Sequence, residues 1–151
     1  MIRKYVRNSD NNLIDCLRKI VCPADDNEEE SKNNSAQQPI QLVNLADIEF
    51  RYMGQLISNM DDVNAFGDFI RQVPNLLILD IIDCPMLQDT TSFFFIKIAE
   101  IDSLKANLKE LILRGSVNFS KMDEGDDEGM LNALLVICKE FRVLTKFDIS
   151  S

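Results

Sequence analysis

The sequence contains no histidine and no tryptophan. Without histidine there can be no Ser-His or Cys-His nucleophile pair, no imidazole general base and no histidine-bearing zinc site. The four cysteines form no C-x-x-C pair, so an all-cysteine zinc site has little support. Only five glycines are present, and none belongs to a G-x-x-x-x-G-K phosphate loop. These absences argue against an enzyme, and we expect neither a metal nor a cofactor.

Long apolar runs and excess positive charge are also missing. The N-terminus has no run of signal-peptide length, and nowhere do eighteen apolar residues follow one another. We therefore expect no membrane contact, a cytoplasmic or nuclear location, and reduced thiols. Sixteen Lys and Arg against twenty-five Asp and Glu give a formal net charge of -9, which repels nucleic-acid phosphates. That charge either serves solubility alone or attracts a basic protein partner.

Three segments differ in composition along the 151 residues. Residues 23–39, "PADDNEEESKNNSAQQP", have no aromatic or branched aliphatic residue, which predicts a disordered acidic linker. Before this linker, apolar residues recur at helical spacing: Leu13, Ile14, Leu17 and Ile20. Residues 1–22 are therefore predicted to form an amphipathic helix, acting as a cap or partial repeat. Residues 40–151 form the main domain.

The main domain repeats the pattern L-x-x-L-x-L. The pattern begins at four residues: Leu45 in "LADIEF", Leu76 in "LLILDI", Leu108 in "LKELIL" and Leu144 in "LTKFDI". These leucines are 31, 32 and 36 residues apart. Apolar trios spaced for one face of a helix precede the last three: Val63, Phe66 and Phe69; Phe95, Ile98 and Ile101; Leu131, Leu134 and Ile137. Each unit is thus predicted as a strand, a turn and a helix that leads to the next parallel strand.

The second unit matches the longer motif L-x-x-L-x-L-x-x-N/C-x-L. The matching residues are Leu76, Leu79, Ile81, Cys84 and Met86. Residues 42–151 therefore resemble leucine-rich repeat proteins of the ribonuclease-inhibitor-like, cysteine-containing variety. The third unit has Ser116 and the first Met53 at the Asn/Cys position, and the units exceed the usual length of about 20 to 29 residues. The resemblance implies an α/β leucine-rich-repeat solenoid of about 3.5 repeats, with parallel strands on its concave face and helices on its convex face.

Alternate strand positions would point onto the concave face of such a solenoid. We expect these residues to bind a protein partner: Asp47, Glu49, Arg51, Ile78, Asp80, Ile82, Glu110, Ile112, Arg114, Lys146, Asp148 and Ser150. Ile78, Ile82 and Ile112 are expected to form an exposed apolar cluster rimmed by charge, which is typical of protein-binding sites. The alternative is that a terminal segment covers them. The resemblance implies a noncatalytic interaction module, such as a substrate-receptor or adaptor fragment.

Three other interpretations involve chemistry rather than recognition. "LLILDI" with a following proline is similar to the phosphoacceptor strand of response-regulator receivers, with Asp80 as acceptor, but the first strand is not followed by the paired acids that would hold magnesium. The acidic run 123–129 does not place oxygen ligands and glycine as an EF-hand does, which favours a flexible loop. Cys84 and Cys138 lie in apolar sequence, so we expect both in the core rather than in redox chemistry.

The fourth pattern reaches Ser151 within or just after a strand. This predicts an open sheet edge, which natural proteins usually cover. We expect either that the chain is a piece of a longer repeat protein or that it self-associates through its C-terminal sheet edge.

Overall fold

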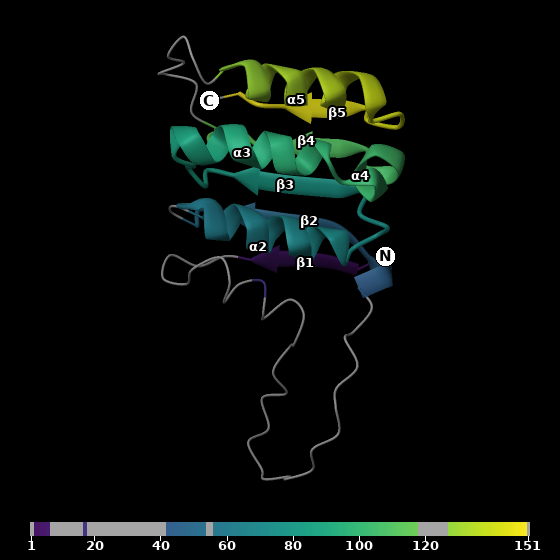
Figure 1. Ribbon diagram of the computed structural model, residues 1–151. Helices are drawn as coiled ribbons and strands as arrows, with labels where there is room; N and C mark the ends of the chain where they lie inside the picture. The colour runs from purple at the N-terminus through teal and green to yellow at the C-terminus, as the bar shows by residue number, and fades with distance from the viewer. Residues whose placement is uncertain (1, 7–16, 18–41, 54–55, 118–126, 151) are drawn as a thin grey trace, which may run out of the picture.

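A computed structural model of the protein describes residues 2–6, 17, 42–53, 56–117 and 127–150. The fold is α/β, with a five-stranded parallel sheet in the order β1-β2-β3-β4-β5 (Figure 1). The strands are β1 (Ile2–Val6), β2 (Leu45–Arg51), β3 (Ile78–Ile82), β4 (Glu110–Ile112) and β5 (Lys146–Asp148). The helices are η1 (Leu42–Asn44), α2 (Met60–Arg71), α3 (Gln88–Ala99), α4 (Asp102–Asn107) and α5 (Asp127–Glu140). The α/β class and the parallel strands that the sequence predicts are confirmed.

Strand β1 was not predicted from the sequence. Residues 2–6 pair in parallel with β2 instead of starting a helix, so the helix prediction for residues 1–22 is wrong at this point. Five residues are too few to reveal a period, and the pairing that makes them a strand comes from the neighbouring β2. Leu17 is helical and buried, but the rest of the predicted helix and the linker 23–39 lie outside the described residues.

Strands β2 to β5 align the repeated patterns residue by residue. Ile48 pairs with Leu79, which pairs with Leu111, which pairs with Phe147, so the strand register follows the steps of 31, 32 and 36 residues seen in the sequence. Three of the four leucines that begin the patterns are buried, and Leu144 is partly buried. The predicted parallel register is therefore confirmed for these four strands.

One turn geometry follows each of β2, β3 and β4. Its central residue has a positive φ in every case: 54° at Tyr52, 52° at Asp83 and 63° at Gly115. The backbone N–H of each donates to a carbonyl at or just beyond the end of the next strand, with donor–acceptor distances of 3.1, 2.9 and 2.8 Å. Glycine is needed at the third turn, because a Cβ at Gly115 would collide with the carboxylate of Asp83. Three successive units thus share one backbone conformation.

Asparagine side chains join successive units at the opposite end of the strands. Asn75 Nδ2 donates to the carbonyl of Val43 at 2.8 Å, and Asn107 Nδ2 donates to the carbonyl of Pro74 at 2.9 Å. Each asparagine directly precedes the leucine that begins a pattern. The corresponding residue of the last unit is Val143, which has no side-chain donor.

Ser116 joins two units at the turn side of the sheet. Its Oγ donates to the carbonyl of Ile81 at 2.9 Å and accepts from the backbone N–H of Cys84 at 3.0 Å. Because Ser116 is buried, it satisfies backbone groups that water cannot reach. The residue at the expected Asn/Cys position of the third unit therefore joins the second and third units by hydrogen bonds.

The core lies between the sheet and one layer of helices. Figure 1 shows α2, α3 and α5 stacked side by side along the strands. The ring centroids of Phe50 and Phe66 are 6.0 Å apart, and those of Phe66 and Phe94 are 5.5 Å apart, which links β2 to α2 and α2 to α3.

No helix within the described residues is long and apolar enough to cross a membrane.

The predicted helix trios differ in burial between units. The trios Val63, Phe66, Phe69 and Phe95, Ile98, Ile101 are buried, whereas in the last trio Ile137 is buried, Leu134 is partly buried and Leu131 is exposed.

The two described cysteines of the main domain differ in burial. Cys84 is buried, and burial raises the pKa of its thiol to about 11. Cys138 is exposed, so the prediction that it packs in the core is wrong.

Candidate protein-binding face

The sheet has a second face, opposite the helices, which we call the strand face. Register and alternation bring all the residues predicted for partner binding onto it. From β2 to β5, one row is Asp47, Ile78, Glu110 and Lys146, and the next is Glu49, Asp80, Ile112 and Asp148. Arg51 pairs with Ile82, and Arg114 and Ser150 follow at the same ends of β4 and β5.

Burial on the strand face differs from the expectation of a solvated surface. Four of its residues are buried: Asp47, Glu49, Asp80 and Ile112. Ile78 and Ile82 are half-buried, while Arg114 and Lys146 near the β5 edge are exposed. The predicted exposed cluster of three isoleucines is therefore wrong at Ile112, because alternation assigns a face but does not reveal how much neighbouring side chains cover it.

Ion pairs neutralise most of the charge on the strand face. They are Arg51 with Glu49, Lys146 with Glu110 at 3.8 Å and Arg114 with Asp148 at 2.8 Å. The hydrogen bonds from Arg114 and Ser150 hold the pKa of Asp148 below its ordinary value. These carboxylates are already occupied by basic groups of the same chain.

Asp80 is different. Its side chain is 7% exposed, and its buried Oδ1 has no hydrogen-bond partner among the described residues. Burial, together with the nearby carboxylates of Asp47, Glu49 and Glu110, raises its pKa to about 6 against the opposing charge of Lys146. At neutral pH Asp80 is therefore a desolvated anion among like charges, an arrangement that costs folding free energy unless a cation is supplied.

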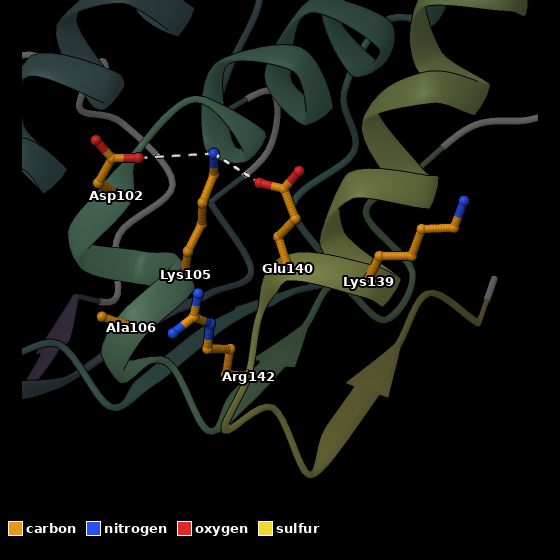
Figure 2. Close-up of a pocket in the computed structure, with 6 residues that line it drawn as sticks. All are labelled: Asp102, Lys105, Ala106, Lys139, Glu140 and Arg142. Atoms are coloured by element: carbon orange, nitrogen blue, oxygen red, sulfur yellow. Dashed lines mark ion pairs between the residues drawn. The ribbon is translucent and has the colours of Figure 1, made fainter.

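A pocket lies where α4 meets the C-terminal end of α5. This pocket of about 440 Å³ is lined by Asp102, Lys105, Ala106, Lys139, Glu140 and Arg142 (Figure 2). Lys105 Nζ lies 3.0 Å from Glu140 and 3.6 Å from Asp102, and the hydrogen bond that Lys105 donates to Glu140 raises the pKa of Lys105. Lys139 points away from the other side chains in Figure 2. Since its central charges pair with one another, the pocket serves better as a junction between the last two units than as a ligand site.

The described residues give little support to the phosphoacceptor and metal-site interpretations of the sequence. Asp80 lies at the middle of β3, with strands on both sides, rather than at the end of a strand. Within the ranges that the structure describes, no group of three or more His, Cys, Asp and Glu side chains is placed to hold a metal ion. Most of the acidic run predicted to form a flexible loop, residues 123–126, lies outside those ranges.

Comparison with protein-family models, curated proteins and solved structures finds no match for this chain. Sequence reasoning identified the residues of the strand face but missed the isolation of Asp80. The available signal was its position in β3, flanked by Glu49 and Ile112 in register, which places a carboxylate at the centre of the sheet.

Proposed function

We propose that the protein is a leucine-rich-repeat-like solenoid that binds an arginine-bearing segment of a protein partner, without catalysis, on its strand face. The observation that carries this proposal is Asp80, a buried carboxylate that lacks a hydrogen-bond partner among the described residues. A folded protein that keeps such a group loses stability by doing so, and binding sites are where that loss is tolerated.

Several features support the repeat architecture. The parallel strands follow one another in chain order, the same left-handed turn follows three of them, and Ser116 bridges neighbouring units at the Asn/Cys position. Proteins of this architecture use the strand face for recognition, because the helices and their loops occupy the other side.

The surroundings of Asp80 favour arginine over lysine. Ile78 and Ile82 precede and follow it on the same face of β3, and both are half-buried. An arginine side chain can lay its methylene stem on such apolar side chains and place its planar guanidinium against the carboxylate of Asp80. Lysine offers a compact ammonium, which cannot form the planar bidentate pair that a guanidinium forms with the two oxygens of one carboxylate.

The biological role that suits this activity is that of a substrate receptor or adaptor. The partner would be basic, in keeping with the net charge of -9. Affinity would fall below pH 6, because the cation binds the ionised form of Asp80, and would also fall with added salt.

Selection of random linear peptides against the 151-residue protein tests this proposal. Enriched peptides should contain arginine, and titration calorimetry should show that Asp80→Asn weakens their binding about thirtyfold or more, since loss of one partner in a buried charge pair costs about 2 kcal/mol or more. Ile82→Glu should also abolish binding while the circular dichroism spectrum stays unchanged.

Asp61→Asn is a matched control, because Asp61 is an exposed acid on α2, away from the strand face. It should leave the affinity within about twofold of the parent protein, as expected for a remote surface charge under screening salt. Enriched peptides without basic residues, or equal losses from Asp61→Asn and Asp80→Asn, would contradict the proposal.

No observation favours the alternative of a receiver-like phosphoacceptor domain. Asp80 is 7% exposed, and the nearest carboxylates pair with basic groups or lie buried. Incubation with acetyl phosphate and magnesium, followed by intact-mass measurement, should leave the mass of the protein unchanged.

A further inference from the structure

Helix α5 exposes side chains that the preceding helices bury. Val63 in α2 and Phe95 in α3 are 1% and 0% exposed, whereas the corresponding Leu131 in α5 is 57% exposed. Leu135, one turn further along α5, is 43% exposed, whereas the corresponding Ala99 is 7% exposed. Helix α3 packs against both α2 and α5, whereas α5 packs against α3 and has no helix beyond it among the described elements (Figure 1).

Among the described strands, β5 pairs with β4 alone, so its other edge is open beside this helix face. The N–H of Lys146 donates to Lys109 and the carbonyl of Asp148 accepts from Leu113, so the backbone groups of these two β5 residues point toward β4. Backbone groups of alternate residues point to opposite edges of a strand. Phe147 therefore presents its N–H and C=O at the open edge, ready to pair with another strand.

We propose that a second copy of this chain covers this end of the stack through a two-fold axis normal to the sheet. Strand β5 would pair with β5 of the other copy in antiparallel orientation, and α5 would pack against α5 on the helix side. We call Leu131, Leu135 and the β5 edge the end surface. One two-fold axis covers both parts of this surface at once, because strand and helix lie at the same end of their layers.

Charge complementarity argues for a second copy as the occupant. With the axis at Phe147, Lys146 of one copy lies opposite Asp148 of the other, and the reverse pair forms at the same time. Since Lys146 already lies beside Glu110, and Asp148 beside Arg114, acidic and basic side chains alternate across the junction.

The same charges fix the register of the pairing. Moving the axis by one residue, to Asp148, would place two aspartates opposite each other, which is unfavourable. Phe147 also has its backbone groups at the open edge, so an axis there lets both copies exchange hydrogen bonds through it. The edge is thus complementary to itself in one antiparallel register.

Sedimentation of the 151-residue chain over a concentration series tests the proposal. The expected species at high concentration has twice the 17.2 kDa mass of one chain and dissociates on dilution. Leu131→Glu with Leu135→Glu should leave single chains at every concentration, with unchanged circular dichroism. Phe93→Glu is the matched control, because Phe93 is a 45% exposed apolar residue on α3, and it should leave association unchanged.

Exchange of the edge charges tests the two-fold register without touching the helix. Lys146→Glu alone should weaken association about tenfold by creating like-charged pairs, and adding Asp148→Lys should restore it. We expect the double variant to associate again even though it loses the two intrachain ion pairs of β5, Lys146 with Glu110 and Asp148 with Arg114. Single chains of the parent protein up to millimolar concentration, a dimer that survives the double leucine change, or failure of the charge exchange to restore association would each overturn the proposal.

Discussion

Replacing Asp80 with asparagine keeps the size of the side chain but removes its charge, and we expect it to stabilise the folded protein at neutral pH. The pKa of Asp80 rises from its ordinary value near 3.8 to about 6 in the folded state. Each whole step in pKa corresponds to about 1.4 kcal/mol between the two protonation states. Asp80→Asn should therefore raise the free energy of unfolding at pH 7.5 by about 1 to 3 kcal/mol.

The sign of this effect depends on pH. Below about pH 3.8 Asp80 is protonated in both the folded and the unfolded chain, so its carboxyl costs nothing and the two proteins should be about equally stable. The destabilisation by the ionised carboxyl grows between about pH 4 and pH 6 and is complete above pH 6. Urea unfolding followed by circular dichroism at pH 4, 5, 6 and 7.5 measures the difference between parent and variant directly.

Asp148→Asn provides the control of opposite sign. The hydrogen bond from Arg114 lowers the pKa of Asp148, so its ionised form stabilises the folded state, and the variant should be less stable at neutral pH and lose that deficit in acid. If Asp80→Asn destabilises the protein at pH 7.5, or if its effect is the same at every pH, Asp80 is neither isolated nor strained by its neighbours. Asp80 would then no longer support the proposed binding of arginine.

Two substitutions test the joints between units. Ser116→Ala leaves the buried N–H of Cys84 and the carbonyl of Ile81 without this partner and should cost about 1 to 3 kcal/mol in urea unfolding; a loss below about 0.5 kcal/mol would show that the bridge is dispensable. Val143→Asn introduces the missing member of the asparagine series, with the carbonyl of Ala106 as its acceptor, and should stabilise the protein by about 0.5 to 1.5 kcal/mol. An unchanged or lowered melting temperature would contradict the equivalence of the last unit.

The sequence predicts the arrangement of β2 to β5 because one physical requirement recurs. Ile48, Leu79 and Leu111 must all be buried between the sheet and the helices, so their spacing in the chain becomes the register of the strands. A pattern repeated at near-constant steps therefore carries long-range information that a single strand does not.

The remaining features depend on interactions that no local pattern records. Strand β1 forms because β2 offers an edge more than forty residues later in the chain, with the predicted linker between them. The isolation of Asp80 arises from side chains on three strands together, and alternation along one strand says only which way its carboxylate points. Cys138 is exposed because, among the described helices, α5 packs against α3 on one side only. This depends on the order of the elements and cannot be read from the sequence of α5 alone.

The order β1-β2-β3-β4-β5 has a consequence for how the protein opens. Every described strand pairs only with the strands before and after it, so strand pairing within the described residues does not tie the first strand to the last. Fluctuations should therefore start at the rims of the sheet, where a strand has one neighbour, and spread inward one strand at a time. Amide hydrogens of β3 would be the last to exchange with solvent, which makes the strand that bears Asp80 the most durable part of the molecule.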